Sequence, residues 1–430
     1  MELAKVFTSH MVLQRNQRIL IWGSGDGVAV VSFLGESVTA SSQNGVWQIA
    51  LSSHPTGGPY TMTCNLDGNI LELDDIYLGD VYLAAGQSNM AFTLKESEQK
   101  LEPSGIARIY TVKKGYENDF RPETDEKWLA CSDENANGIS AVGAQFACAL
   151  SKEQNVPIGI ISCNQGASCI ESWIPKEAVE QSGLLMPIAK RHGDASGFPF
   201  NGSGYLFRNM MEEIIPLPLT AVLWYQGESN RKESEANNYK NLLTLMIRNW
   251  RALWNRPDLP FFIVQLAAFE EDSCAAAWQL IREQQLIAAQ TISDVSMVTT
   301  GDCGELDQIH PRDKKTVGYR LSLCARNKIY GENVEYCGPI CTSMKAENGK
   351  MVLSFTHCSG SLTVKAPLNL QIAGEDGIFQ TAEYSISGNQ LLVWHENISP
   401  YEVRLCFCND AEMGLFNQEG LPASPFRICR

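Results

Sequence analysis

The sequence predicts an α/β domain with a mostly parallel sheet, flanked by a β-rich module at each end. Between residues 75 and 331, short apolar runs alternate with longer stretches of helical period, which is typical of βαβ units. Before and after this region, stretches with period-two alternation are separated by turns rich in Gly, Pro and Asn, which is typical of antiparallel strands. We therefore expect three domains, at residues 1–74, 75–331 and 332–430.

The bulk composition excludes several classes of protein. With 430 residues the chain is too long for one ordinary core, and 44% hydrophobic against 19% charged residues is typical of globular proteins. A formal net charge of −15, with no local run of Lys or Arg, argues against nucleic acid as a partner. No apolar stretch reaches the ~18 residues of a membrane span. We expect neither nucleic acid nor a membrane as a partner.

The fourteen cysteines are scattered from Cys64 to Cys429 and form no CxxC pair. With only six histidines, and none beside the closest cysteine pairs, the sequence offers little for a metal site, and we expect none. Scattered cysteines favour a reducing compartment, and the start Met1–Lys5 lacks the features of a signal peptide. Both favour the cytoplasm. A chain trimmed of its signal peptide would look the same, so a secreted or periplasmic location stays open.

The strands and helices of the middle region can be predicted one by one. Apolar, partly β-branched runs predict buried strands, and amphipathic stretches between them predict helices. The expected strands are Val81–Ala85, Ile158–Ser162, Ala221–Tyr225, Phe261–Gln265 and Val295–Thr299; the expected helices include Gly143–Gln154, Tyr239–Trp254, Trp278–Gln290 and Lys315–Tyr330. In the flanking modules, Ile19–Trp22 and Val28–Phe33 on one side and Ile378–Tyr384 and Leu391–Trp394 on the other predict antiparallel strands.

Three of the predicted strands end in polar clusters: residues 86–89 (Gly-Gln-Ser-Asn), 164–168 (Asn-Gln-Gly-Ala-Ser) and 226–230 (Gln-Gly-Glu-Ser-Asn). Because ligands bind at the carboxyl ends of strands in an open α/β sheet, we expect the clusters to meet at one edge. A Ser hydroxyl, a flexible Gly and a carboxamide donor are the parts of a nucleophile with an oxyanion hole. Ser88 is the candidate nucleophile. The alternative is that these residues only form turns.

A Ser nucleophile needs a base, and His310 is the best placed of the six histidines. It follows the last predicted sheet strand and precedes a helix, and Asp307 lies three residues before it. A single turn can then present the carboxylate to the imidazole, which fixes its tautomer and stabilises the imidazolium. The alternative is a surface Asp-His pair near a helix start. The other five histidines have adequate structural explanations in turns, loops and the flanking modules.

Taken together, three motifs resemble the sialate O-acetylesterase family of SGNH-type serine esterases. They are Gly86–Met90, Trp224–Asn230 and Asp307–Pro311. Further segments look like the same family: His10–Gln14, Asp258–Phe261, and Arg282, Glu283 and Gln285 in the following helix. The resemblance covers roughly residues 5–331; beyond that, the chain matches only in being rich in β-structure.

This resemblance implies a three-layer α/β/α SGNH-hydrolase domain and a catalytic triad of Ser88, Asp307 and His310. It also implies an oxyanion hole formed by the backbone N–H groups of Ser88 and Gly166 and the side chain of Gln226, with no metal or organic cofactor. Polar residues of the same motifs, together with one nearby arginine, are the expected substrate contacts: Gln87, Asn89, Glu228, Asn230 and Arg208.

Two departures from the family pattern concern the substrate pocket. The family usually has two adjacent glycines where this chain reads Gln165-Gly166-Ala167, and a Tyr-Asn-Gly segment where it reads Phe207-Arg208-Asn209. The resemblance implies a carbohydrate O-acetylesterase, and first a sialate O-acetylesterase that uses an acetyl-enzyme. The alternatives are an esterase for acetylated plant oligosaccharides, such as mannan or xylan fragments, and a catalytically dead carbohydrate-binding protein.

Overall fold

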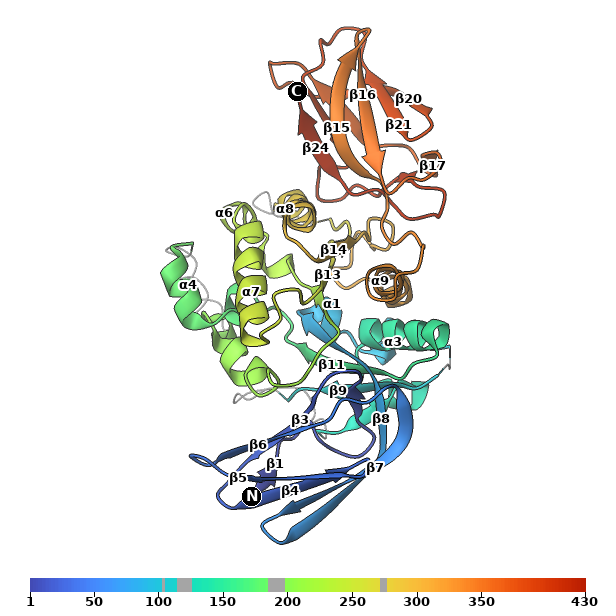
Figure 1. The fold of residues 1–430 in the computed structure, drawn as a ribbon. Helices are drawn as coiled ribbons and strands as arrows, with labels where there is room; N and C mark the ends of the chain where they lie inside the picture. The colour runs from blue at the N-terminus through green and yellow to red at the C-terminus, as the bar shows by residue number, and fades with distance from the viewer. Residues whose placement is uncertain (103–104, 114–125, 185–197, 271–276) are drawn as a thin grey trace. The chain divides into compact units, whose positions relative to one another are not determined.

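The computed structural model describes residues 1–102, 105–113, 126–184, 198–270 and 277–430. Figure 1 shows the course of the chain and labels its helices and strands. The chain divides into two compact units, which are described separately. The first unit comprises residues 1–224 and 244–261, and the second comprises residues 225–243 and 262–430. The three predicted modules remain a prediction. No helix in the described ranges is long and apolar enough to cross a membrane.

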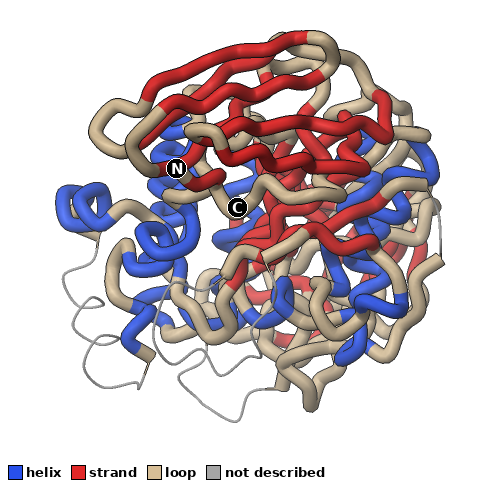
Figure 2. The backbone as a smooth tube through the Cα atoms, turned by 90° about the horizontal axis from the view of Figure 1, so that it is seen from below, coloured by secondary structure: helices blue, strands red, loops and turns tan. Residues whose placement is uncertain are grey.

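The first unit begins with antiparallel strands, as the alternation predicts. In β6 (Val46–Leu51) every second side chain is buried, which is the pattern of a strand with one face on a core. Figure 2 shows these strands lying side by side near the N-terminus. The others are β1 (Glu2–Leu3), β2 (Val12–Gln14), β3 (Ile19–Ser24), β4 (Val28–Phe33), β5 (Glu36–Ser41) and β7 (Gly57–Leu66).

One long strand, β8 (Asn69–Gly86), passes from this β-rich region into the α/β sheet. Its first half pairs antiparallel with β7, and its second half pairs in parallel with β11 (Ile158–Asn164). The side chains of its first half are largely exposed, whereas every residue from Gly79 to Gly86 is buried. The predicted strand at residues 81–85 is therefore confirmed as the end of a longer strand, and no linker separates it from the N-terminal strands.

The α/β sheet of the first unit has the strand order β10-β9-β11-β8-β12. Its strands β8, β9 and β11 run in parallel, and the edge strand β10 is antiparallel to β9. All residues of β11 and β12 are buried, as expected for strands covered on both faces. The remaining bounds are β9 (Ala107–Thr111), β10 (Trp128–Ala130), β12 (Ala221–Tyr225), α3 (Ala141–Gln154) and α4 (Lys176–Ser182).

In the second unit, the α/β part contains β14 (Val295–Val298), α8 (Trp278–Thr291) and α9 (Lys314–Lys328), each within a few residues of its prediction. Backbone hydrogen bonding continues beyond the strands, because Gln265 N donates to Val298 O at 3.0 Å. β13 (Phe261–Val264) and α7 (Tyr239–Leu253) have residues in both units, and both match their predicted ranges.

The C-terminal part of the second unit consists of two four-stranded antiparallel sheets and a short pair. Phe355 of the first sheet contacts Phe426 of the second, with ring centroids 5.9 Å apart, so the sheets share a core. Their orders are β15-β16-β21-β20 and β19-β18-β22-β24, beside β17-β23. The bounds are β15 (Ile340–Glu347), β16 (Lys350–Thr356), β17 (Thr363–Val364), β18 (Leu370–Ala373), β19 (Gln380–Thr381), β20 (Glu383–Ser387), β21 (Gln390–Trp394), β22 (Glu402–Leu405), β23 (Leu415–Phe416) and β24 (Phe426–Cys429).

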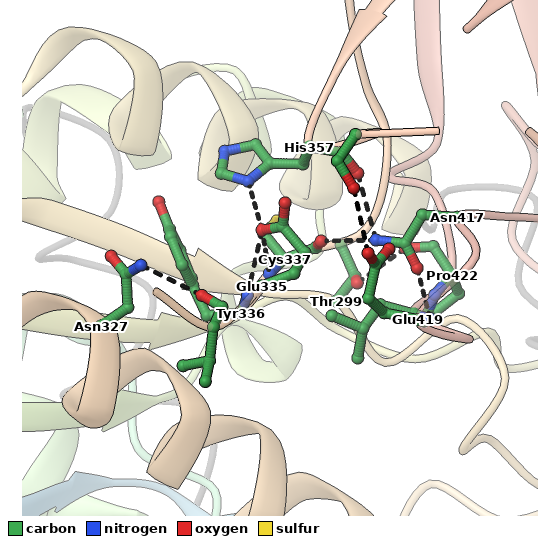
Figure 3. Close-up of polar contacts among 12 residues, drawn as sticks. Thr299, Asn327, Glu335, Tyr336, Cys337, His357, Asn417, Glu419 and Pro422 are labelled. Carbon is green, nitrogen blue, oxygen red and sulfur yellow. Dashed lines mark hydrogen bonds and ion pairs between the residues drawn. The ribbon is translucent and has the colours of Figure 1, made fainter. Parts of the chain in front are cut away.

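Within the second unit, buried polar contacts attach these C-terminal strands to the α/β part (Figure 3). Thr299 Oγ1, just after β14, donates to Pro422 O at 2.8 Å, and Asn417 Nδ2 donates to Cys337 O and His357 O at 3.1 Å each. Glu335 accepts a hydrogen bond of 2.7 Å from the His357 ring, and this bond helps to lower the pKa of Glu335 against the opposing effect of burial. The connection is therefore an ordered, hydrogen-bonded segment.

Candidate active site

Ser88 lies at a sharp turn from strand to helix. β8 ends at Gly86, whose φ of 141° suits glycine, and Ser88 is the first residue of the short helix α1 (Ser88–Ala91). Ser140 Oγ donates to Met90 O at 2.6 Å and thereby fixes α1 against the start of α3. Ser88 is half-buried. The turn therefore places a partly exposed Ser88 on a rigid support.

Gly166 lies next to Ser88. Asn164 pairs with Gly86 in the β8–β11 register, and Gln165 N donates to Gly86 O at 3.0 Å. A Cβ atom added to Gly166 would lie 3.6 Å from Ser88 Cβ, which is ordinary van der Waals contact. Two of the predicted strand-end clusters therefore meet, as expected, although their catalytic roles stay predictions. Gln87 and Asn89, expected as substrate contacts, are each only 2% exposed.

The residue after Gly166 has a backbone conformation that is unusual for its type. Ala167 has a φ of 57°, a left-handed conformation that glycine adopts without steric cost. Asn201 holds this loop, because its Nδ2 donates to Ala167 O at 2.9 Å and its Oδ1 accepts from Cys169 N at 2.8 Å. The loop therefore holds an alanine in a conformation that favours glycine.

Gln226, in the second unit, is fully buried and hydrogen-bonded at both ends of its carboxamide. Its Oε1 accepts from the Tyr239 hydroxyl at 2.8 Å, and its Nε2 donates to Asn230 Oδ1 at 2.8 Å. Gln285 of α8 donates to its backbone oxygen at 3.1 Å. Asn230, expected to contact substrate, thus supports Gln226. The next residue, Gly227, has a φ of 152°, and an added Cβ would meet Ile281 at 2.8 Å.

Glu228 is 1% exposed and lies within the electrostatic reach of Lys314, the first residue of α9. Lys314 is also 1% exposed; its Nζ donates to Pro311 O at 2.5 Å and lies 5.9 Å from the centre of the Tyr225 ring. Burial lowers the pKa of Lys314 to about 8, and Glu228 is the largest opposing influence. A buried lysine therefore contacts the residue that follows His310.

The loop that carries Asp307 and His310 is irregular. His310 is half-buried, whereas Asp307 is exposed and its carboxylate has no hydrogen-bond or ion-pair partner among the described residues. Two other carboxylates of the loop are engaged: Asp302 forms two hydrogen bonds with Arg320, of 2.6 and 2.8 Å, and Glu305 accepts from Arg312 N at 2.7 Å. Asp302 and Glu305 therefore have structural tasks, and Asp307 stays the predicted partner of His310.

Arg208 is exposed and lies in the π-helical turn at Phe207–Met211, the other place where the chain departs from the family. No described residue forms an ion pair or hydrogen bond with its side chain. Its predicted contact with substrate stays a prediction. In the described parts of the chain, no three His, Cys, Asp or Glu side chains are grouped so that they could hold a metal ion.

Sequence reasoning missed four residues of this region: Tyr239, Lys314, Arg320 and Asn201. Each acts through side-chain hydrogen bonds from a position far along the chain or within an ordinary helix, and such contacts leave no mark in a hydrophobic pattern. Gln285 was noticed only as part of the family resemblance, and the structure gives it a task. Its Oε1 accepts from Leu266 N at 3.0 Å, so it fixes the end of β13 and the backbone of Gln226.

Comparison with known proteins gives consistent results. Residues 78–322 match the family model for carbohydrate esterase, sialic acid-specific acetylesterase. The human sialate O-acetylesterase is 26% identical over 82% of this chain and 76% of its own length, and the mouse enzyme is 26% identical over 82% and 78%. A carbohydrate acetylesterase from Xanthomonas citri has a similar structure, with a TM-score of 0.87, 31% identity and 99% coverage of both chains.

The family model covers more than half of the 430 residues, and the Xanthomonas citri structure matches over nearly the whole chain, including its C-terminal strands. The predicted α/β fold with flanking β-structure is thereby confirmed, and so is the expectation of a carboxylic-ester hydrolase acting on acetylated carbohydrate. The chain belongs to the carbohydrate esterase family of sialic acid-specific acetylesterases.

Proposed function

We propose that the chain removes O-acetyl groups from sialic acid through an acetyl-enzyme. His310 takes the proton from Ser88 as Ser88 Oγ attacks the acetyl carbonyl carbon. The negative charge that forms on the carbonyl oxygen is stabilised by the N–H groups of Ser88 and Gly166 and by the side chain of Gln226. The C–O bond to the sugar then breaks, and His310 gives its proton to the departing sugar hydroxyl. Water hydrolyses the acetyl-enzyme by the same route in reverse.

The observation that most supports this mechanism is the placement of Gly166 against Ser88 at the ends of two parallel strands, in a chain of this family. The choice of sialic acid is supported by the curated relatives, which are sialate O-acetylesterases. A second substrate class, acetylated plant oligosaccharides, is favoured by the chain's net charge of −15, because sialic acid is itself an anion. Asp307 is proposed to orient His310 and to stabilise its imidazolium.

One experiment tests both parts of the proposal. Acetate release is measured from O-acetylated sialic acid, from acetylated xylan and mannan fragments, and from a chromogenic acetate ester, with wild type and Ser88→Ala. We expect Ser88→Ala to lose activity by ~10³-fold or more on every substrate while it remains folded. Ordinary activity of the folded variant would overturn the mechanism. If, among the sugars, acetate is released only from the plant oligosaccharides, the mechanism stands and the substrate is an acetylated plant oligosaccharide instead of sialic acid.

A further inference from the structure

The carboxamide of Gln226 is held by a hydroxyl group from a different element. The Tyr239 hydroxyl, at the start of α7, lies 2.8 Å from Gln226 Oε1 and also 2.8 Å from the backbone oxygen of Gln226. One hydroxyl thus bridges the side chain and the main chain of the same residue. Tyr239 and Gln226 are each 0% exposed, so water does not compete for this bond.

Hydrogen bonds at the oxygen and at the nitrogen of the carboxamide fix its plane. Because an amide group is flat, an acceptor bond at Oε1 and a donor bond from Nε2 to Asn230 Oδ1 determine the direction of both N–H vectors. The proposed mechanism assigns the second N–H of Nε2 to the oxyanion. An oxyanion donor stabilises the transition state only when it is aimed in advance at the oxygen, since reorientation during the reaction costs free energy.

We infer that Tyr239, together with Asn230, is a positioning residue for Gln226 in the esterase reaction. Tyr239 acts through Gln226 and touches neither the acyl group nor the sugar. This inference rests on the proposed function, because it takes Gln226 to be an oxyanion donor. It also gives the segment between Gln226 and Tyr239 a purpose: the chain turns through Glu228–Asn230 and α6 (Glu233–Ala236) and returns with Tyr239 to the carboxamide.

The inference makes a claim about coupling that a merely structural role would not make. If Tyr239 acts only by orienting Gln226, removing its hydroxyl should not affect the rate in a variant that lacks the carboxamide. In kinetic terms, Tyr239→Phe lowers kcat in the wild-type background and has no further effect in the Gln226→Ala background. KM changes little, because the aimed N–H is needed by the oxyanion and not by the ester in its ground state.

The test is a double-mutant cycle on a chromogenic acetate ester. We expect Tyr239→Phe to lower kcat about tenfold with KM within twofold, Gln226→Ala to lower kcat ~10²-fold, and the double variant to equal Gln226→Ala. Tyr336→Phe is the control, since it removes the hydroxyl of a half-buried phenol of the same unit, and it should leave kcat unchanged. Asn230→Leu provides a second route, because it removes the other hydrogen bond and should show the same loss of additivity.

Two results would overturn the inference. One is a kcat for Tyr239→Phe and Asn230→Leu within twofold of wild type; the other is a full, additive loss in the Gln226→Ala background. Either result leaves the proposed function intact as long as Ser88→Ala is inactive. If Tyr239→Phe does not fold, the Asn230→Leu cycle decides. An active Ser88→Ala protein would instead remove the proposed function, and the inference with it.

Discussion

The segment that carries Ser88 and the loop that carries His310 are held in place by different means. Ser88 is fixed by regular backbone: the buried second half of a strand, a glycine turn and the start of a helix, with the neighbouring strand end bonded to Gly86 O. The loop from Thr299 to Pro311 has no regular structure and is fixed by buried cationic side chains. Arg320 donates to Thr299 O and Asp302, and Lys314 donates to Pro311 O.

Because the two regions are held differently, their side chains divide differently between supporting the structure and taking part in the reaction. The Ser88 segment is supported by its own backbone groups and by the Ser140 side chain from outside it, so its own side chains are available for chemistry. In the His310 loop, charged side chains support the structure and charged side chains are also proposed to react, and the two kinds stand within a few residues of each other. Substitutions in this loop should therefore divide into those that change the rate and those that change the stability.

The sharpest test compares two aspartates of the same loop. Asp307→Asn should lower the rate ~10²-fold or more, because the imidazolium loses its counter-charge and the wrong tautomer becomes accessible; the midpoint of thermal unfolding should hardly change, because Asp307 is exposed. Asp302→Asn should do the opposite. It breaks the bidentate pair with Arg320, whose side chain is 6% exposed, and should cost roughly 1–3 kcal/mol of stability.

Both variants are measured by steady-state kinetics across pH and by thermal unfolding. The comparison fails if Asp302→Asn, while still folded, loses more rate than Asp307→Asn. In that case Asp302 would be the partner of His310, and its pairing with Arg320 would be a resting arrangement.

Lys314 provides a second test, which depends on pH. Since burial lowers its pKa to about 8, the ammonium loses its proton, and its positive charge near Glu228 disappears, as the pH rises through about 8. We expect wild-type activity to decline above this pH, because the loop bearing His310 is then less firmly attached. Lys314→Met should lower kcat about tenfold at pH 7, which corresponds to an activation free energy higher by ~1.4 kcal/mol. The activity of this variant should not decline at alkaline pH.

The sign of the stability effect distinguishes this decline from unfolding. The pKa of Lys314 in the folded chain is below the ordinary value of 10.5, so the unfolded chain binds more protons between these two values. This group therefore adds stability as the pH rises from about 8 to 10.5. Activity should fall while thermal stability does not fall on account of Lys314. The exposed neighbour Lys315→Met is the control; an alkaline decline that persists in Lys314→Met would contradict the assignment.

The same contrast explains how much could be predicted from the sequence. The strands ending at Gly86 and Asn164 follow from their apolar runs, and the meeting of Ser88 with Gly166 follows from the rule that parallel strands end at one edge. The Asp-x-x-His spacing could be noticed as well. The supports of the loop could not be predicted, because Arg320 and Lys314 lie in a helix whose pattern gives no reason to bury a charge.

Buried hydrogen bonds between residues far apart in the chain are the contacts that the sequence does not predict. Tyr239 is one apolar-patterned residue at the start of a helix, and nothing in its neighbours shows that its hydroxyl reaches Gln226. The long strand β8 is another case. Its first half is exposed and its second half buried, so the sequence suggests two elements in two modules, whereas the backbone continues without a break.

The smallest expected effect concerns the Ser88 side of the comparison, where backbone conformation is the support. Ala167 adopts a left-handed φ of 57°, which costs an L-residue ~1–2 kcal/mol. Replacing it with glycine removes this cost, but the greater freedom of glycine in the unfolded chain offsets part of the stability gained. Ala167→Gly should therefore stabilise the protein by about 1 kcal/mol and leave kcat unchanged, since Asn201 still holds the loop. Urea unfolding at fixed pH measures the change. The matched control is Ala147→Gly within α3, where the same substitution should destabilise by ~1 kcal/mol or more. A loss of stability in Ala167→Gly would show that the contacts of the alanine methyl group stabilise the loop by more than the left-handed conformation costs.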